Sequence, residues 1–240
     1  MKEPRISLII CAYNEEKYIA DCLQSSIQNS SGKLYEIIVV NNKSTDRTKE
    51  ISLQFSGVRA VDENNKGLTK ARQCGLCEAR GDILAYIDAD TRMPVGWVEK
   101  IISEFTQNST FVSVSGPYVY YDMSKLYNFW VRVYWFILVY PLYFIFGYMV
   151  IGGNFAIKKE VLEKMGGFDT SIQFYGEDTN IARRAHQFGK VKFIPSLVMP
   201  TSGRRLLEQG VIKTAFVYGV NFFSEVFFKR PAHTVYKDHR

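Results

Sequence analysis

The stretch Ile83-Leu84-Ala85-Tyr86-Ile87-Asp88-Ala89-Asp90 decides the fold class of this chain. Its apolar run predicts a buried strand, and two carboxylates one residue apart follow directly. In open α/β sheets, ligands bind at the carboxyl edge of the strands, where Asp88 and Asp90 fall. A divalent cation that carries a diphosphate would compensate both charges, because hard oxygen ligands suit Mg²⁺ or Mn²⁺. The alternative is a solvated turn with two acids and no ligand.

Strand and helix patterns alternate through the first half of the chain. Short apolar runs predict buried strands at residues 6–10, 37–40 and 58–61. Helical apolar periods follow Asn14 and recur at residues 67–80. Residues 44–46 predict an N-cap, and Pro94 predicts the first turn of another helix. Repeated β-α units of this length predict an α/β fold with a doubly wound, mostly parallel sheet flanked by helices.

Composition narrows the class of protein and of partner. The 240 residues are 47% hydrophobic and 15% aromatic, which excludes a disordered chain. A net charge of +6 indicates an anionic partner, but the basic residues are scattered, so we expect no nucleic acid. Cys74 and Cys77 form a lone C-x-x-C without a second pair at zinc spacing. No signal-peptide pattern opens the sequence, so we expect a reducing, cytoplasmic setting.

The second half of the chain contains two apolar segments. Residues 133–151 carry no charge and are long enough to span a membrane, but their aromatic content is typical of the membrane–water interface. Arg132 and Pro141 are expected to interrupt a helix there. Residues 206–228 mix apolar side chains with a few Lys and Arg residues. They predict an amphipathic helix that lies at a membrane surface.

A second acidic signal is Gly176-Glu177-Asp178, which precedes a helical pattern. Acids at a helix N-terminus can simply complement the macrodipole. The other reading is chemical, because an ionised carboxylate that faces a cleft can act as a general base toward a hydroxyl.

Six motifs taken together resemble the family-2 glycosyltransferases of the GT-A fold over residues 5–205. In chain order they are residues 9–16 (IICAYNEE), residues 39–46 (VVNNKSTD), Lys70-Ala71-Arg72 before Gly81-Asp82, Asp88-Ala89-Asp90, Gly166-Gly167-Phe168-Asp169 and Gly176-Glu177-Asp178. The resemblance implies an inverting enzyme that uses a nucleotide-diphosphate sugar, a hydroxyl acceptor and a divalent metal, Mg²⁺ or Mn²⁺.

The resemblance also implies a nucleotide site in the first half of the chain. Tyr13 would stack near the base, with Ala12 and Glu15 beside it in the same motif. Asn41 would contact the base or the ribose, and Arg72 would reach the base or the phosphates.

Metal and catalytic roles follow in the same way. Asp90 would be the surest metal ligand, and Asp88 would face the ribose or the metal. Asp178 would be the catalytic base, with Glu177 beside it in the acceptor pocket. A metal held by Asp90 would neutralise the charge that develops on the leaving diphosphate.

The chain departs from the family pattern in three places that bear on function. Asn41 stands where the family usually has Asp, which leaves the identity of the nucleotide open. No His is evident near residues 200–205 to complete the metal site, and Arg204 and Arg205 are expected to clamp the diphosphate instead. The Gln-x-x-Arg-Trp signature of processive synthases is absent, which predicts one sugar per encounter.

The order of the motifs restricts the apolar segment. Asp90 and Asp178 must share one cleft, yet residues 133–151 lie between them in sequence, so one membrane crossing would separate them. A re-entrant pair around Pro141, an interfacial helix, and a buried core or a surface between copies of a homo-oligomer stay open. We expect peripheral or monotopic attachment at the inner face of the cell membrane, and an acceptor that is lipid-linked or close to the membrane.

The expected organisation is a glycosyltransferase domain over residues 1–205, with an apolar insertion at 127–151, followed by an amphipathic helix and tail over 206–240. Two other functions stay open. A nucleotidyltransferase would need a Gly-rich phosphate loop near the N-terminus, which residues 11–14 (CAYN) do not provide. A catalytically silent scaffold on the membrane surface would be consistent with Asn41 but not with intact Asp88, Asp90 and Asp178.

Overall fold

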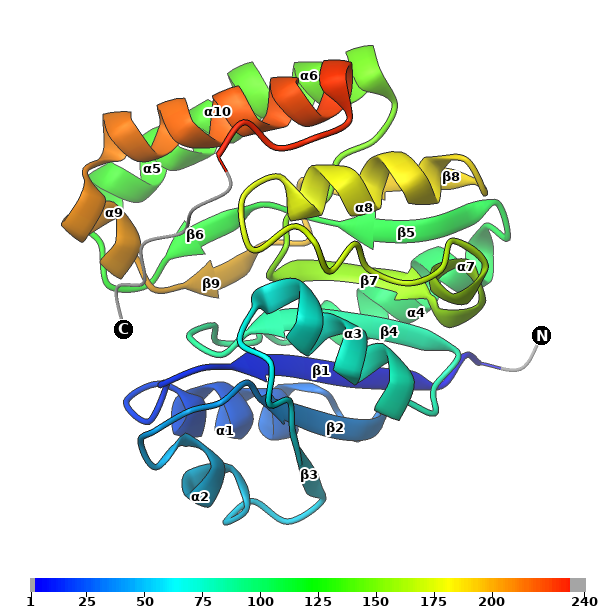
Figure 1. The fold of residues 1–240 in the computed structure, drawn as a ribbon, viewed down its shortest axis with the longest axis vertical. Helices are drawn as coiled ribbons and strands as arrows, with labels where there is room; N and C mark the ends of the chain where they lie inside the picture. Colours follow the sequence, from blue (N-terminus) through cyan, green and yellow to red (C-terminus); the bar gives the residue numbers. More distant parts are fainter. Residues whose placement is uncertain (1–2, 234–240) are drawn as a thin grey trace.

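A seven-stranded sheet forms the centre of the computed structural model, which describes residues 3–233 (Figure 1). The strand order is β3-β2-β1-β4-β7-β5-β8. The strands are β1 Ile6–Ala12, β2 Leu34–Asn41, β3 Val58–Asp62, β4 Ile83–Asp88, β5 Phe111–Ser115, β7 Asn154–Lys158 and β8 Lys190–Phe193. All neighbours pair in parallel except β7, which runs antiparallel to both β4 and β5. The predicted α/β class with a mostly parallel sheet is confirmed.

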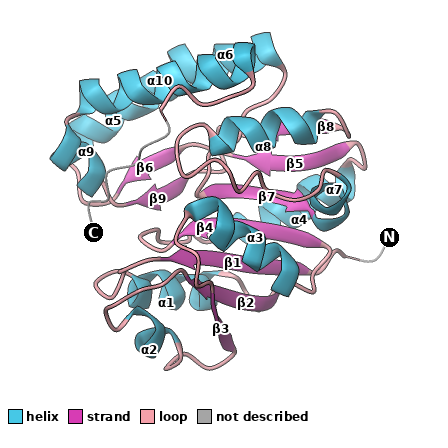
Figure 2. Cartoon of the chain, viewed as in Figure 1, coloured by secondary structure: helices cyan, strands magenta, loops and turns pink. Residues whose placement is uncertain are grey.

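Helices cover both faces of this sheet (Figure 2). They are α1 Ile19–Asn29, α2 Thr48–Ser52, α3 Leu68–Glu78, α4 Trp97–Gln107, α7 Lys159–Lys164 and α8 Glu177–His186. Strand β1 shows how the layers form, because Leu8 and Ile10 pack in the core that includes α1 and α4, whereas Ile9 packs with α3 and α8. This alternation is the period of two that a strand buried on both faces produces.

Two predicted helix starts are wrong by a few residues. Helix α4 begins at Trp97 rather than at Pro94, because Gly96 adopts a left-handed φ of 83° and turns the chain just before the helix. Helix α2 begins at Thr48, and its backbone N–H donates to Asp46 Oδ1 at 3.0 Å. Asp46, the last of the residues expected to cap this helix, therefore bonds to its first residue, although Arg47 lies between them in the sequence.

A second, two-stranded sheet lies beside the carboxyl edge of the main sheet. It pairs β6 Tyr118–Tyr120 with β9 Met199–Thr201. A long helix follows β6 and consists of α5 Lys125–Tyr134, the π-helical segment η1 Trp135–Val139 and α6 Tyr140–Phe146. This helix has 22 residues, a mean hydropathy of 1.6 and only 6% burial in its most apolar window, so its length and composition alone would allow it to cross a membrane.

Pro141 does not break this helix, contrary to expectation. Proline lacks the N–H that would bond to the carbonyl four residues earlier, and the π-helical turn directly before it accommodates that missing bond. A re-entrant pair around Pro141 is therefore wrong.

One side of the long helix packs on the protein. Trp135 Nε1 donates to the Tyr118 carbonyl at 3.0 Å, and its ring lies 6.0 Å from the ring of Phe193. The chain enters the helix from β6 and leaves it toward β7, so both ends are joined to the sheets (Figure 1). The helix therefore lies along the protein, with its other side exposed.

The C-terminal segment forms two helices instead of one. Gly210, with a φ of 82°, separates α9 Arg204–Gln209 from α10 Val211–Phe228. Helix α10 has the opposite burial pattern to an ordinary surface helix: the polar residues Asn221 and Glu225 are buried, and the apolar residues Phe216 and Phe227 are exposed. Of the predicted C-terminal region, residues 234–240 lie outside the described residues.

Candidate active site

Strand β4 delivers the two aspartates to the carboxyl edge of the sheet. Asp88 is its last residue, and Asp88 Oδ2 accepts a hydrogen bond from the Tyr118 hydroxyl at 3.1 Å. Thr91 N–H and Oγ1 both donate to the Asp88 carbonyl, which closes a tight turn over residues 88–91. A bridge between Thr91 and Thr201 places this turn beside β9, and the Asp90 carboxylate accepts a hydrogen bond from Thr201 Oγ1 at 3.4 Å.

Arg204 joins Asp90 to the first motif of the chain. Its Nη2 lies 2.9 Å from Asp90 Oδ2 and 2.5 Å from Glu15 Oε1. Glu15 is 2% exposed, so its charge is compensated inside the protein by this guanidinium. The two carboxylates raise the pKa of Arg204 further above its usual range. Arg204 is therefore a fixed cation at the predicted metal ligand.

Arg205 lies elsewhere, although it is the next residue. Its Nη1 donates to the Tyr218 hydroxyl at 2.5 Å, and its guanidinium lies 4.5 Å from the centre of the Phe174 ring. The two arginines therefore diverge, one toward Asp90 and the other toward α10.

Two consecutive glycines lie between the two acidic clusters. A methyl group on Gly153 would come within 2.2 Å of Asp88 Oδ2, and one on Gly152 would come within 2.6 Å of Glu177 Oε1. Only glycine therefore leaves room for both carboxylates. The Gly152-Gly153 pair was missed at the sequence level, and it brings the Asp88 and Glu177 regions together although they are far apart in the chain.

Glu177 and Asp178 open helix α8 behind Gly176, whose φ is 81°. The Arg72 guanidinium forms an ion pair with Glu177 and donates to the Gly152 carbonyl at 2.6 Å. Arg72 is 2% exposed, and its guanidinium is held by Glu177 and by the Gly152 carbonyl. Burial raises the pKa of the Glu177 carboxyl, and the Arg72 charge opposes that rise.

Asp178 is only partly buried, unlike Glu177. Its Oδ1 accepts the backbone N–H of Thr179 at 2.8 Å. Desolvation raises the pKa of Asp178 above the usual aspartate value. A partly exposed carboxylate with a raised pKa has the properties that general-base catalysis requires.

A hollow of about 300 Å³ lies at the end of β1 and beside α3. It is lined by Cys11, Ala12, Tyr13, Asn42, Lys66, Gly67, Leu68, Ala71, Gln173 and Phe174. Ala12 and Tyr13 were predicted to bind the nucleotide, and Lys66 Nζ lies 3.8 Å from the centre of the Tyr13 ring. Lys66 and Asn42 were not predicted, because neither carries a local signature.

Asn41 precedes Asn42 of this hollow in the sequence and is held by a carboxylate. Its Nδ2 donates to Asp62 Oδ1 at 2.8 Å, and Lys49 forms an ion pair with the other carboxylate oxygen of Asp62. Asp62 therefore places a negative charge next to the position where the family usually has Asp.

The donor set fits a divalent metal that completes its coordination with a ligand. Within residues 3–233, no three His, Cys, Asp or Glu side chains are clustered in a way that could hold a metal ion. Asp88 and Asp90 nevertheless supply hard oxygens at one sheet edge, and Mg²⁺ commonly binds one or two carboxylates together with substrate phosphates. The cation now paired with Asp90 belongs to Arg204, which is consistent with a site built for positive charge.

Solved structures of similar fold contain nucleotides and metal. A mannosyltransferase from Pyrobaculum calidifontis in complex with GDP-Man and Mn²⁺ superposes with a TM-score of 0.68 at 20% identity, covering 95% of this chain and 64% of that one. Glucosyl-3-phosphoglycerate synthase from Mycobacterium tuberculosis, in complex with Mn²⁺, UDP and phosphoglyceric acid, gives a TM-score of 0.61 at 19% identity and covers 94% of this chain and 78% of that one. These likenesses confirm the fold.

Sequence comparison identifies the family. The probable glycosyltransferase YdaM of Bacillus subtilis is 28% identical over 224 residues, which cover 82% of this chain and 51% of that protein. The chain thus spans about half the length of this relative. A family model described as glycosyl transferase family 2 matches residues 7–166, most of the α/β domain. The chain belongs to glycosyl transferase family 2 and has the GT-A fold of the family.

Proposed function

We propose that this chain transfers a single sugar from a nucleoside-diphosphate sugar to an acceptor hydroxyl with inversion, and that Asp178 is the general base. The main support is the Gly152-Gly153 pair, which lies between the carboxylates of Glu177 and Asp88. A donor bound at Asp88 and Asp90 would therefore lie close to the acid pair of α8. Proximity of this kind supplies a large share of the rate in group transfer.

The donor would bind across the first half of the chain. The nucleobase of the donor would occupy the hollow beside Tyr13. Arg204 would contact the diphosphate, because a planar guanidinium matches phosphate geometry. A divalent metal held by Asp90 and Asp88 would neutralise the charge that develops on the leaving diphosphate. Arg72 would hold Glu177 in place through their ion pair, and Glu15 would hold Arg204 in the same way.

The transfer step needs one base opposite the leaving group. The acceptor oxygen attacks the anomeric carbon, the bond from that carbon to the diphosphate oxygen breaks, and the hydroxyl proton passes to Asp178. One displacement inverts the configuration at the anomeric carbon. The raised pKa of Asp178 makes it a stronger base than an exposed aspartate.

Two variants test these roles. With Mn²⁺ present, Asp178→Asn should bind UDP or GDP as tightly as the wild type but lose at least about 100-fold in hydrolysis of UDP-glucose or GDP-mannose. Asp90→Ala should lose metal-dependent nucleotide binding as well, while the exposed control Asp21→Asn should change neither. Full activity of Asp178→Asn would reject the base assignment, and a wild type that binds no nucleotide would favour a silent scaffold.

A second part of the proposal concerns the membrane. An apolar face, defined here by exposed large apolar side chains, extends over the long helix and α10. It consists of Leu126, Phe129, Trp130, Tyr134, Phe136, Ile137, Leu138, Phe144 and Ile145 from the long helix and Phe216, Phe223, Phe227 and Phe228 from α10. Contacts of Phe146 with the rings of Phe222 and Phe223 join the two helices. Contiguous exposed apolar surface of this kind marks an interaction site.

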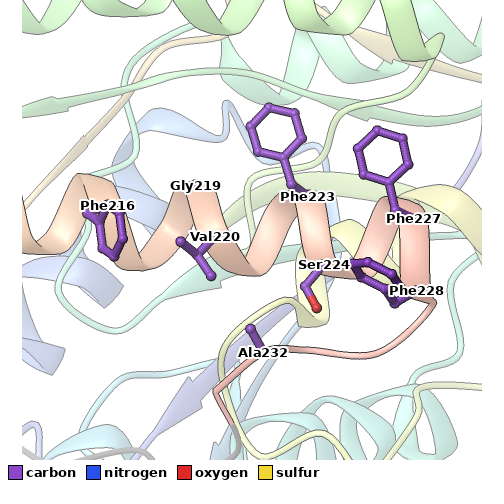
Figure 3. Close-up of a pocket in the computed structure, with 8 residues that line it drawn as sticks. All are labelled: Phe216, Gly219, Val220, Phe223, Ser224, Phe227, Phe228 and Ala232. Carbon is purple, nitrogen blue, oxygen red and sulfur yellow. The ribbon is translucent and has the colours of Figure 1, made fainter.

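The larger of the two hollows that we describe, about 540 Å³, lies on this face and not at the acidic clusters. Figure 3 shows its lining residues on α10, with the rings of Phe223 and Phe227 projecting to the same side of the helix. Lys213, Lys229 and Arg230 belong to the same helix or follow it, and basic residues are attracted to anionic lipid. We infer peripheral attachment through the apolar face.

Attachment of this kind would bring the site close to the bilayer. Tyr218 of α10 contributes to the electrostatic surroundings of Asp178, while the opposite side of the helix is apolar and exposed. Since a helix is about 10–12 Å across, the base would lie about one helix diameter from the lipid surface. An acceptor that is lipid-linked or held at the membrane fits this placement.

Vesicle flotation tests the attachment. The double variant Phe136→Asp with Phe227→Asp should lose binding to vesicles that contain anionic lipid, whereas Leu53→Asp, which changes an exposed leucine on α2's C-terminal side, should bind like the wild type. If the wild type stays unbound and sediments as a dimer that the double variant abolishes, the apolar face joins two copies of the chain instead.

A further inference from the structure

Glu225 is a buried carboxylate on the inner side of α10. It is 0% exposed, and its Oε1 accepts hydrogen bonds from Asn180 Nδ2 at 2.9 Å and from Arg183 Nη2 at 2.8 Å. Both partners belong to α8, the helix that begins with Glu177 and Asp178. Burial of an ionised carboxylate away from water costs free energy unless the charge is paired. The contact of Glu225 with Asn180 and Arg183 therefore specifies how α10 packs against α8.

The segment after α10 closes on the start of α8 as well. A methyl group on Gly176 would lie 3.4 Å from Pro231 Cβ, so Pro231 packs directly against the residue before the acid pair. The backbone N–H of His233 donates to Asn221 Oδ1 at 2.9 Å, which holds this segment against α10. Helix α10 and the residues after it therefore form one wall around the N-terminus of α8.

The rest of α8 has an independent anchor. Ile181, Ala182 and Ala185 are buried in the core on that face of the sheet. These contacts fix the position of the helix axis, but they lie beyond the first turn. The first turn, which carries Asp178, is held by the ion pair between Arg72 and Glu177 on the α3 side and by the hydrogen bond from Asn180 to Glu225 on the α10 side.

We propose that Glu225 is a positioning residue for Asp178, and that it couples the seating of α10 to the orientation of the catalytic base. This inference rests on the proposed function, in which Asp178 is that base. Phe223 and Phe227 flank Glu225 in sequence, and their exposed rings project to the same side of the helix (Figure 3). Contact of the apolar face with a membrane would then stabilise the position of α10, and through Glu225 the orientation of Asp178 at the start of α8.

The kinetic test uses Glu225→Gln, with Arg183→Gln as a second variant in case the first fails to fold. The matched control is Glu104→Gln, because Glu104 is also buried and pairs with Lys192 at 2.7 Å, away from α8. The probes are UDP-glucose and GDP-mannose with Mn²⁺. We expect kcat for donor hydrolysis to fall by about tenfold in both α8–α10 variants, with KM unchanged within about twofold, because misorientation of a base weakens catalysis without weakening donor binding.

A pH profile separates positioning from simple loss of folded protein. The charged and titratable groups around Asp178 are Arg72, Glu177 and Tyr218. Loosening α10 admits water, which lowers the raised pKa of Asp178, so the acid limb of kcat should move to lower pH in Glu225→Gln. A smaller fraction of folded enzyme would reduce kcat without moving that limb.

Hydrogen exchange tests the inference independently of activity. In Glu225→Gln, amides at residues 177–181 should exchange faster than in the wild type, while residues 97–107 should not change. Unchanged exchange at 177–181 would overturn the inference, and so would kinetics in both variants that match Glu104→Gln. If residues 177–181 exchange faster in Glu225→Gln but the wild-type protein hydrolyses neither donor, the proposed function is rejected and the contact between α8 and α10 is not.

Discussion

Replacing Arg204 by glutamine should change two affinities in opposite directions. In the structure the guanidinium lies 2.9 Å from Asp90 Oδ2 and 2.5 Å from Glu15 Oε1, so it competes with any metal for Asp90. When a donor binds, the same side chain would contact the diphosphate. Arg204→Gln should therefore bind Mn²⁺ alone more tightly than the wild type, and bind UDP or GDP less tightly when Mn²⁺ is saturating.

The magnitude follows from the contacts. A hydrogen bond to a charged group contributes about 1.5–3 kcal/mol, and the lower end applies because the Arg204 side chain is 21% exposed. Since about 1.4 kcal/mol corresponds to a tenfold change, the Kd for Mn²⁺ should fall by about tenfold. Loss of one charge-assisted contact to the diphosphate should raise the Kd for UDP or GDP by about the same factor.

Isothermal titration calorimetry measures both affinities, and a thermal melt checks that the variant folds. The matched control is Arg92→Gln, which makes the same chemical change two residues from Asp90. Arg92 pairs with the exposed Asp21 at 2.7 Å and not with Asp90. The control should alter neither affinity. If Arg204→Gln weakens both affinities, or leaves Mn²⁺ binding unchanged, the guanidinium does not occupy the metal position and this reasoning is wrong.

Three other predictions concern Gly153, Asp178 and Asn41. Gly153→Ala should weaken Mn²⁺ binding by about tenfold because the new methyl group displaces Asp88, whereas Gly219→Ala, which has open space around it, should have no effect in the same titration. The rate of donor hydrolysis should fall as the pH drops through the raised pKa of Asp178, since only the ionised carboxylate accepts a proton; an acid limb below pH 3.8 would contradict the effect of burial. Asn41→Asp should destabilise the protein by about 1 kcal/mol at pH 8, because two carboxylates would face each other at the position of the 2.8 Å contact with Asp62. The loss should vanish below the unfolded-state pKa of the new aspartate, and equal melting temperatures of variant and wild type at pH 8 would refute this.

The sequence indicated much of the fold because its central strands are continuous apolar runs. Residues 83–88 form β4, and Asp88 lies at the sheet edge where the strand pattern requires it. Strand β7 was harder to predict, because nothing in its local pattern indicates that it inserts antiparallel between β4 and β5.

Buried polar pairs were the main omission at the site. Arg72 and Glu177 are 105 residues apart, and each alone looks like a surface or ligand-binding charge. The packing of α3 against Gly152 brings them together, whereas the nucleotide contact of Arg72 was implied by the family resemblance and stays a prediction. Glu15 and Arg204 were separated into different roles for the same reason.

The apolar segments were recognised from their composition, but their geometry was not. Pro141 predicted a break because proline removes a helical hydrogen bond, and the π-helical turn before it keeps the helix continuous. Helix α10 shows Phe residues around a buried Glu225, an arrangement that composition does not reveal.

The stereochemistry of donor hydrolysis tests the proposed reaction most directly. With Mn²⁺ present, ¹H NMR can follow the sugar first released from UDP-glucose or GDP-mannose, whose anomeric centres are α, before mutarotation. A single displacement with Asp178 as the base predicts the β-anomer first, and no release by Asp178→Asn. Appearance of the α-anomer first, or equal release by Asp178→Asn, would contradict an inverting transferase built around this residue.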